Sequence, residues 1–501
     1  MVDCKGFCNM HMNKPSSPTQ NIIKGAFWTI GARWVIKFIG FINTIIMARI
    51  LLPEDYGLVA AAMLAVGLLQ TFMDFGATTA LLRLSNPAAD YINSAWTLKI
   101  IQGTAVSVAI IALSGVIGKF LQKPEIIHIL WTFAVAIFLA SLGNIGLTLA
   151  VKDFNFKLGA KIDVISKIAS VAVTLSVGMV QKSHWALVMG IVAGYITPLV
   201  LSYAWHPYRP TWSTEKVGEI WKLTKWLLLA SIGSFVLRKG DEIIASKIGT
   251  SHEYGLYNVG ADLGQLPVQE IGPAMLKALL PVLSSMEDAE EYINDAIHRT
   301  TAAINTIIWP IALGFAVLSE HATAILLGPK WIEAAKYVYA FAIISALQTA
   351  TAPIKILLTL RGHTRTQSMQ VWREFAVFAG AAGLLITHSG LYSLAIARAI
   401  ASITNLFDVL LTAKNLCRLD VKSSLLAIFR PLAIAAAMAV LVHLLNAEFT
   451  NPYLAIIISL ITGGGAYTFA ILVVWTLLGK PNGIESMAIN QIKQLKRGKD
   501  N

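Results

Sequence analysis

The stretch MARILLPEDYGL, residues 47–58, decides the fold of this chain because it occurs twice. Its second copy reads ASKIGTSHEYGL and occupies residues 245–256, at a shift of 198 residues. The register extends beyond the two strings. The aligned pairs include Arg49 with Lys247, Tyr56 with Tyr254, Gly57 with Gly255, Lys24 with Lys222 and Trp28 with Trp226. A duplicated unit of this kind predicts two lobes with a site between them, which is how many secondary transporters are built.

The composition predicts an integral membrane protein. Hydrophobic residues make up 56% of the 501 positions and charged residues only 14%, whereas soluble domains carry about 25% charged residues. A helix of about 20 apolar residues crosses the hydrocarbon layer of a membrane. Stretches long enough to do so lie at 24–48, 57–82, 96–118, 127–150, 162–181, 184–204, 224–248, 257–281, 302–320, 335–359, 372–388, 390–413, 427–446 and 453–478.

The repeat distance contains six of these spans, so both copies enter the membrane in the same direction and form a parallel repeat. The expected fold is all-α, with about 14 transmembrane helices: two six-helix lobes and two further C-terminal helices. The acidic stretch 286–300 predicts a separate short amphipathic helix. The predicted boundaries are a cytoplasmic tail at 1–21, an N-terminal lobe at 22–204, a cytoplasmic linker at 205–223, a C-terminal lobe at 224–413, two helices at 414–479 and a basic tail at 480–501.

The net charge of +12 reflects membrane topology rather than nucleic-acid binding. With the N-terminus in the cytoplasm, most of the 40 lysines and arginines fall in cytoplasmic segments, which predicts that both termini are cytoplasmic. These basic groups face anionic membrane lipids. The three cysteines, Cys4, Cys8 and Cys417, lie on the same predicted side, so no disulfide is expected. With no Walker A sequence, no zinc spacing and no nucleophile–base arrangement, we expect no enzymatic activity, no cofactor and no metal site.

Two predicted spans carry a polar stripe on nearly the same face. In 24–48 the stripe steps by three or four residues and comprises Thr29, Arg33, Lys37, Gly40 and Thr44. In 224–248 it comprises Ser231, Ser234, Arg238, Asp241 and Glu242. The chemistry differs, because Arg33 and Lys37 have no acidic neighbour one turn away. The second stripe carries its own acids, so Arg238 can pair with Asp241 or Glu242, and Lys239 with Glu242.

Ionisable side chains within spans are the candidate site residues, because at the bilayer centre each costs about 3 kcal/mol on insertion scales. The candidate cations lining a substrate cavity are Arg33, Lys37, Arg238, Lys239, Lys355 and Arg398. The candidates for ion coupling or charge pairing are Asp74, Asp241, Glu242, Asp262 and Glu270, and Asp408 is a further acid. We expect a water-filled cavity lined by positive charge that receives an anion. The alternative is that each cation pairs with an acid of another helix or extends to the membrane interface.

Several stretches resemble one transporter family. They are ARILLPEDYGLVA (48–60), FMDFGATTALLR (72–83), VKDFNFKLGAKIDVIS (151–166), HWALVMG (184–190) and ILLGPKWIEAAK (325–336). Together they are similar to the polysaccharide transporters of the multidrug/oligosaccharidyl-lipid/polysaccharide (MOP) exporter superfamily, in particular the O-antigen and colanic-acid repeat-unit flippases. The combination is specific to the family but not to one substrate.

The resemblance implies a fold of fourteen helices with two six-helix lobes in a V, working by alternating access. It implies a flippase in the bacterial cytoplasmic membrane that moves an undecaprenyl-pyrophosphate-linked oligosaccharide to the periplasmic leaflet for surface polysaccharide synthesis. The polymerase and chain-length proteins of that pathway are the implied partners, and a proton or sodium gradient is the implied energy source. The family's cationic cavity, carried over by position, points to Arg33, Lys37 and Arg238, because a pyrophosphate needs cations at close quarters.

Three other functions stay open at this point. An exporter of cationic drugs in the same superfamily would need an acidic cavity, which the excess of cations within spans argues against. A flippase for the peptidoglycan lipid precursor shares the architecture and is separated only weakly by sequence. A membrane polysaccharide polymerase or ligase is expected to carry a large periplasmic loop, and the predicted outside loops are short.

Overall fold

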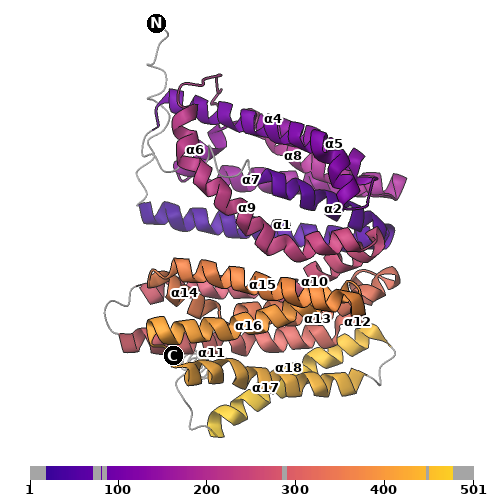
Figure 1. Ribbon diagram of the computed structural model, residues 1–501, viewed down its shortest axis with the longest axis vertical. Helices are drawn as coiled ribbons and strands as arrows, with labels where there is room; N and C mark the ends of the chain where they lie inside the picture. The colour runs from indigo at the N-terminus through magenta and orange to yellow at the C-terminus, as the bar shows by residue number, and fades with distance from the viewer. Residues whose placement is uncertain (1–17, 72–80, 82–86, 285–289, 447–450, 478–501) are drawn as a thin grey trace, which may run out of the picture. The chain divides into compact units, whose positions relative to one another are not determined.

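The computed structural model describes residues 18–71, 81, 87–284, 290–446 and 451–477, and all regular structure within these residues is helical. The chain divides into two compact units, described separately below (Figure 1). Unit 1 comprises residues 1–51 and 58–236, and unit 2 comprises 52–57 and 237–501. This division does not test the lobe boundaries predicted from the sequence, which stay a prediction.

Unit 1 consists of helices that pack mainly against their sequence neighbours. They are α1 (Pro18–Ile50), the body of α2 (Pro53–Gln70), α4 (Ala89–Phe120), α5 (Ile126–Ser141), α6 (Gly146–Lys152), α7 (Phe156–Gln181), α8 (Trp185–Trp205) and the first part of α9 (Val217–Ile248). Helices α7 and α8 form a hairpin across a tight turn in which Lys182 adopts the left-handed conformation. Helix α1 packs along α7, and α4 packs along α5.

Unit 2 contains the remaining helices. They are the end of α9, α10 (Ser251–Ser284), α11 (Glu290–Val317), α12 (Ser319–Leu326), the 3₁₀ helix η2 (Pro329–Ala334), α13 (Ala335–Ala350), α14 (Ala352–Leu360), α15 (Thr364–Ser389), α16 (Tyr392–Cys417), α17 (Val421–Asn446) and α18 (Pro452–Leu477). Helix α13 packs against α10, α11 and α16, while α17 packs against α11 and α18. The core includes the fully buried Trp309 and Val409.

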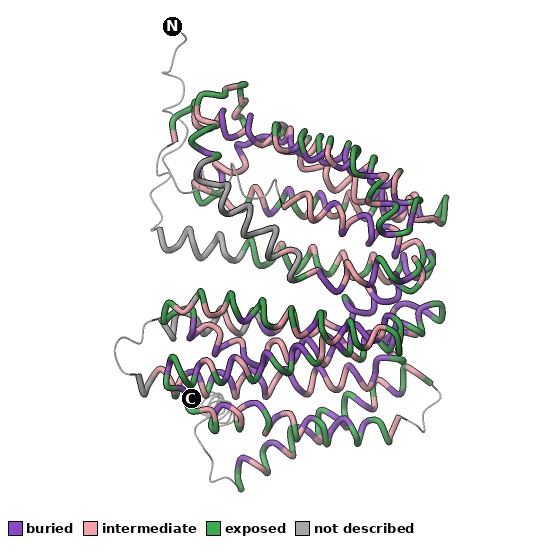
Figure 2. The backbone as a smooth tube through the Cα atoms, in the orientation of Figure 1, coloured by how far each residue is buried: buried purple, intermediate pink, exposed green. Residues whose placement is uncertain are grey.

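The helices have the length and surface of membrane spans. Among the described residues, ten helices are long and apolar enough to cross a membrane, and the pair α5 and α6, bent by 59°, adds an eleventh. The other three predicted spans fall on α2, α9 and α10, so the structure is consistent with fourteen. Buried and exposed positions recur along the spans (Figure 2), and large apolar side chains such as Phe38 are 65% exposed. The protein is therefore a multi-pass α-helical membrane protein.

The structure differs from the helix predicted for residues 286–300. The stretch 286–300 was expected to form a separate helix, and this is wrong for its described part, because α11 runs without a break from Glu290 to Val317. No Gly or Pro interrupts its first turns, and Asp295 pairs with Arg299 one turn later at 2.6 Å. Helix α10 is likewise continuous through Pro267 and Pro273, so this polar span is not broken.

The segment that follows α8 is fixed to unit 1 by side-chain hydrogen bonds. The Asn144 amide donates to the Tyr208 carbonyl oxygen at 2.7 Å, and the Tyr208 hydroxyl donates to Asn93 Oδ1 at 2.8 Å. The Thr211 backbone N–H donates to the same Asn93 oxygen at 3.1 Å. These bonds satisfy backbone groups of a segment without regular structure and lead the chain into α9.

The two copies of the repeated motif begin α2 and α10 with equivalent caps. The Asp55 carboxylate accepts the Leu52 backbone N–H at 3.1 Å. In the second copy, Glu253 accepts the Thr250 backbone N–H at 2.9 Å, and the Thr250 hydroxyl accepts the Glu253 N–H at 3.2 Å. Both carboxylates therefore satisfy an otherwise unbonded N–H at a helix start, which explains the acidic residue in each copy.

Equivalent residues of the two copies also touch each other inside unit 2. Glu54 Oε1 lies 2.9 Å from His252 Nδ1, and these two positions differ by the repeat distance of 198. A Cβ added at Gly57 would lie 1.8 Å from the Ser251 carbonyl oxygen, and one at Gly255 would lie 1.9 Å from the Pro53 carbonyl oxygen. The starts of α2 and α10 thus cross backbone to backbone, and only glycine fits at the crossing.

This crossing generates the first prediction. Gly57→Ala or Gly255→Ala should destabilise the protein by roughly 3 kcal/mol or more, because the added methyl group meets rigid backbone. Gly115→Ala in α4 is the control, since its Cβ meets nothing within 4 Å, and it should leave stability unchanged or slightly raised. The measurement is the thermal unfolding of detergent-solubilised protein. Equal melting temperatures for all three variants would contradict the proposed constraint.

Candidate functional site

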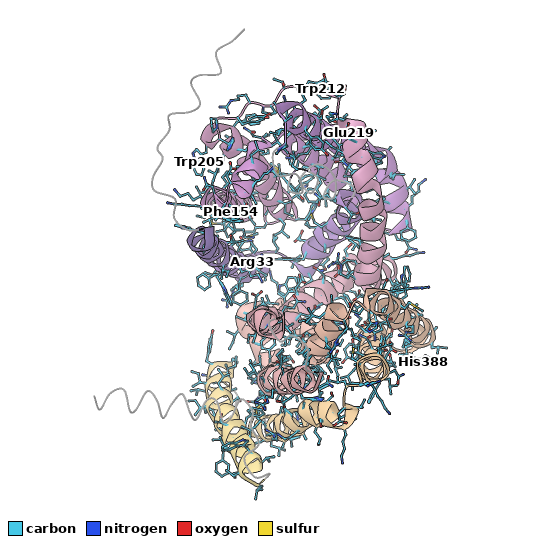
Figure 3. The ribbon with its side chains drawn as sticks, turned by 90° about the vertical axis from the view of Figure 1, so that its left-hand side faces the viewer. Arg33, Phe154, Trp205, Trp212, Glu219 and His388 are labelled. Carbon is cyan, nitrogen blue, oxygen red and sulfur yellow. The ribbon has the colours of Figure 1, made fainter. Side chains whose placement is uncertain are left out.

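A groove of about 550 Å³ runs along unit 1 between α1 and α7. Helix α1 contributes Thr29, Arg33 and Lys37, three members of the stripe recognised in the sequence, and α7 contributes Phe156, Gly159 and Asp163. The side chains of Arg33 and Lys37 are exposed. Figure 3 shows Arg33 on α1. The stripe on the first span therefore borders a groove within its own unit.

The close approach of α1 and α7 depends on where small residues lie. A Cβ added at Gly40 would come within 3.1 Å of Lys167 Cε and 3.2 Å of Lys167 Nζ, so the Lys167 side chain rests on the α1 backbone. Nearer the starts of the two helices, Lys157 Nζ lies 5.3 Å from the centre of the Trp28 ring. Such a cation–π contact stabilises a cation where water is scarce.

The groove and its ends carry more positive than negative charge. Along the parallel helices, Lys157 comes first, Arg33 and Lys37 follow on α1, and Lys167 lies at Gly40. Asp163, one turn before Lys167, is the carboxylate that lines this groove. From Lys157 to Lys167 the helix rises about 15 Å. The cations thus extend over about half of the hydrocarbon thickness.

Sequence reasoning did not assign Asp163 and Lys167 to the site. The basic residues of 151–167 were interpreted as signals of membrane topology. A usable signal was present, because Phe156, Gly159, Asp163 and Lys167 recur at spacings of three to four and so share one helix face. What the sequence does not give is the partner of that face, which the structure identifies as α1.

The two acids of the second stripe, Asp241 and Glu242, lie in unit 2 and each meet a cation. Lys239 pairs with Glu242 on the same helix, as the sequence allows. Asp241 is buried and accepts a hydrogen bond from the Tyr257 hydroxyl of α10 at 3.1 Å. It also lies 3.8 Å from Arg398 Nη1 of α16. Arg238, the alternative partner of Asp241 in the sequence, has an exposed side chain.

Aromatic rings surround Asp241 and its partners Tyr257 and Arg398, which together are called the acidic centre of unit 2. The Tyr257 ring packs edge-on against Phe341 at 5.4 Å and against Tyr337 at 5.3 Å, and the Arg398 guanidinium lies 5.9 Å from the Phe378 ring centre. Arg398 is 19% exposed. Its position matches the alternative that a cation within a span pairs with an acid of another helix.

The other predicted site residues are dispersed in the structure. Asp408 pairs with Arg373 of α15 at 2.9 Å. The backbone carbonyl of Lys355 accepts a hydrogen bond from the Gln367 amide, and the Lys355 side chain is half-buried. Asp262 is exposed and Glu270 is half-buried on α10. Asp74 lies outside the described residues, and among the described ones no three His, Cys, Asp or Glu side chains gather as a metal site would require.

Solved structures of similar fold are membrane transporters. The lipid II flippase MurJ in an inward closed conformation superposes with a TM-score of 0.69 at 14% identity, covering 90% of this chain and 99% of that one. An inward-facing multidrug resistance MATE family transporter of the MOP superfamily gives a TM-score of 0.58 at 13% identity, covering 76% and 94%. At these identities the likeness concerns the fold alone.

The sequence then places the chain within a family. It belongs to the polysaccharide biosynthesis protein family, whose model matches residues 46–336. The lipopolysaccharide biosynthesis protein WzxC of Escherichia coli K12 is 22% identical, covering 69% of this chain and 71% of that protein. The teichuronic acid biosynthesis protein TuaB of Bacillus subtilis is 21% identical over 90% and 95%. The succinoglycan biosynthesis transport protein ExoT of Rhizobium meliloti is 21% identical over 64% and 65%.

The acidic centre of unit 2 generates the second prediction. Arg398→Met should destabilise the protein by about 3 kcal/mol, because it leaves the buried Asp241 carboxylate without its cation. Arg299→Met is the matched control. It removes an arginine that is 53% exposed from its pair with Asp295, which is 54% exposed, and it should cost less than about 1 kcal/mol.

Thermal unfolding of the two variants in the same detergent provides the comparison. Asp241→Asn combined with Arg398→Met should recover part of the loss, because no buried charge is then left alone. Equal losses in the two single variants would show that the Asp241–Arg398 contact contributes no more than an exposed ion pair.

Proposed function

We propose that this chain is a flippase that carries undecaprenyl-pyrophosphate-linked oligosaccharide repeat units across the bacterial cytoplasmic membrane for surface polysaccharide synthesis. The carrying observation is the groove between α1 and α7, in which cations within membrane-spanning helices outnumber the carboxylate that lines it. Membership in the polysaccharide biosynthesis protein family and the relatives named for lipopolysaccharide, teichuronic acid and succinoglycan supply the substrate class.

The chemistry of the groove suits a phosphorylated head group. A pyrophosphate carries at least two negative charges, and Arg33 can hold two of its oxygens with one guanidinium. Lys37 lines the groove one turn further on, and Lys167 lies beyond it at Gly40, so both can take up the same charge as it moves. The polyprenyl chain stays in the bilayer, so the groove needs to hold only the polar head and the sugars.

Alternating access of two lobes is the proposed mode of transport, and both termini are proposed to be cytoplasmic. The concentration of lysine and arginine in the segments that would then be cytoplasmic supports that orientation. A proton or sodium gradient is the proposed energy source. The polymerase and chain-length proteins of the same pathway are the proposed partners, because the product of transport is their substrate.

The runner-up function is transport of the peptidoglycan lipid precursor, which the likeness in fold to MurJ favours. Both substrates present a pyrophosphate, so the cationic groove does not separate them. A drug exporter is less well supported, because organic cations would be repelled by Arg33 and Lys37. Deletion of the gene separates the three functions, because each predicts a different lipid-linked intermediate or none.

The third prediction concerns the cells that lack this protein. Complete undecaprenyl-linked repeat units should accumulate on the cytoplasmic face, and surface polysaccharide should be lost. Lipid extraction with mass spectrometry gives the intermediate, and protection from an added sugar-modifying enzyme gives its side of the membrane. Accumulation of the peptidoglycan precursor would support the runner-up, and a normal lipid profile with altered drug tolerance would support the exporter.

The fourth prediction tests the groove in the same cells. Arg33→Ala with Lys37→Ala should reduce polysaccharide output about tenfold or more, because a charge-assisted bond contributes about 1.5–3 kcal/mol. Lys119→Gln with Lys182→Gln is the matched control, as it removes two exposed cations of unit 1 that do not line the groove. Expression in the membrane fraction must be equal. Unchanged output from the groove variant would exclude Arg33 and Lys37 from the site.

A further inference from the structure

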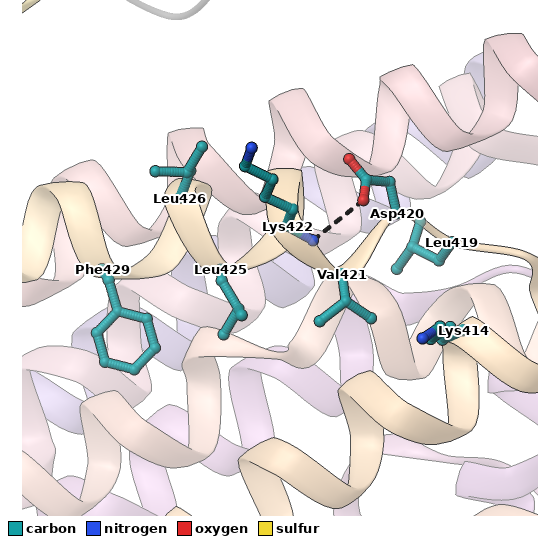
Figure 4. A pocket seen from close by; sticks show the side chains of 8 residues that line it. All are labelled: Lys414, Leu419, Asp420, Val421, Lys422, Leu425, Leu426 and Phe429. Carbon is teal, nitrogen blue, oxygen red and sulfur yellow. Dashed lines mark hydrogen bonds between the residues drawn. The ribbon is translucent and has the colours of Figure 1, made fainter.

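A second groove, of about 570 Å³, lies in unit 2 where α16 gives way to α17 (Figure 4). Lys414 near the end of α16 and Lys422 at the start of α17 line its polar part. The apolar part is formed by Leu425, Leu426 and Phe429 of α17. Neither the transport site nor the charged residues predicted from sequence include this groove.

The connection between the two helices is short and tightly bonded. Arg418 adopts the left-handed conformation that ends α16, and its backbone N–H donates to the Ala413 carbonyl oxygen. Asp420 then begins α17, where its carboxylate accepts the backbone N–H groups of Lys422 at 3.1 Å and Ser423 at 3.2 Å. The hydrogen bond from the Ser423 hydroxyl, and then these two backbone bonds, lower the pKa of Asp420, so its carboxylate stays ionised in the helix cap.

The polar end of the groove therefore presents positive charge. The side chains of Lys414 and Lys422 are both exposed, and they come from different helices. Asp420 is the carboxylate in the lining, and its oxygens accept hydrogen bonds from the first turn of α17. The two ammonium groups can accordingly act on an anion without displacing an existing ion pair of the lining.

Below the lysines the groove becomes apolar along one face of α17. Lys422, Leu426 and Phe429 follow one another at spacings of four and three, so they share a face. Leu426 is 59% exposed and Phe429 is 41% exposed, within a helix long and apolar enough to span the membrane. From Lys422 to Phe429 the helix rises about 10 Å. Cations at the end of a span, followed by two turns of accessible apolar surface, complement a phosphate joined to an acyl chain.

We propose that the groove lined by Lys414, Lys422, Leu426 and Phe429 binds an anionic glycerophospholipid of the surrounding bilayer. The phosphate lies between the two ammonium groups, and one acyl chain lies along Leu426 and Phe429. The site holds the α16–α17 junction against α11, to which Ser424 is joined by a hydrogen bond to His298 at 3.2 Å. This lipid is a resident ligand, and the proposal does not depend on the transported substrate.

Segments of the chain itself fit the groove less well. The C-terminal residues 480–501 are basic and carry the same sign as the lysines. The acidic residues that precede α11 match the charge but supply no hydrocarbon for Leu426 and Phe429. Free phosphate likewise satisfies only the polar half. A phospholipid satisfies both halves, and as the solvent of α17 it is present at high local concentration.

The test compares Lys414→Gln with Lys422→Gln against Arg361→Gln with Arg365→Gln. The control removes two exposed cations, one at the end of α14 and one at the start of α15, and neither lines the groove. Each full-length protein is placed in vesicles of phosphatidylcholine with or without phosphatidylglycerol. Native mass spectrometry then counts bound phosphatidylglycerol, and thermal unfolding measures its effect on stability.

Wild type and control should retain phosphatidylglycerol and melt at a higher temperature in its presence. The groove variant should bind it about tenfold more weakly, since each cation near an anionic lipid contributes measurably to binding, and should lose the rise in melting temperature. Equal binding by groove variant and control would overturn the proposal. A lower melting temperature of the groove variant in pure phosphatidylcholine would also overturn it, because it would indicate that the lysines pair with the acidic segment. So would an equal rise in the melting temperature of the wild type with inorganic phosphate or a short polyprenyl phosphate.

Discussion

The backbone crossing of α2 and α10 at Gly57 and Gly255 is the constraint on which the repeat depends. Each glycine faces a carbonyl oxygen of the other copy at a distance that no side chain tolerates. The carboxylates of Asp55 and Glu253 hold the two helix starts in the geometry that allows this approach. Because equivalent residues meet, the two motifs are related by a local two-fold, and neither copy can change its glycine without disturbing the other.

Around this shared scaffold the two copies have diverged in how they balance charge. Helix α9 supplies acids to two cations: Glu242 meets Lys239 of the same helix, and Asp241 meets Arg398 of α16. Helix α1 has no acid of its own near Arg33 and Lys37, and the carboxylate of its groove comes from α7 as Asp163. The acids of the second stripe therefore lie on the same helix as its cations, whereas the carboxylate that lines the groove of α1 comes from another helix.

The sequence was sufficient for whatever depends on local pattern. Hydropathy gave the spans, and the spacing of polar residues gave the stripe on α1. The sequence does not predict side-chain contacts between helices that are distant in the chain, because these depend on how the helices are aligned with one another. That Lys167 rests on Gly40, or that Asp241 meets Arg398 instead of Arg238, follows from how helices pack. The continuity of α11 escaped prediction because charge was taken as the end of a span, although helical hydrogen bonding does not require apolar residues.

Asp163 gives the groove a property that cations alone would lack. Cations that line one groove repel one another, and a carboxylate among them reduces that repulsion. In the proposed function, one carboxylate would reduce this repulsion while leaving a net attraction for a pyrophosphate, which brings more charge and more acceptor oxygens. Once the pyrophosphate has left, the same carboxylate would again supply a counter-charge, so release would cost less than from a site of cations only. The proposed transport requires binding and release of the same ligand, and a groove that is incompletely neutralised suits both steps.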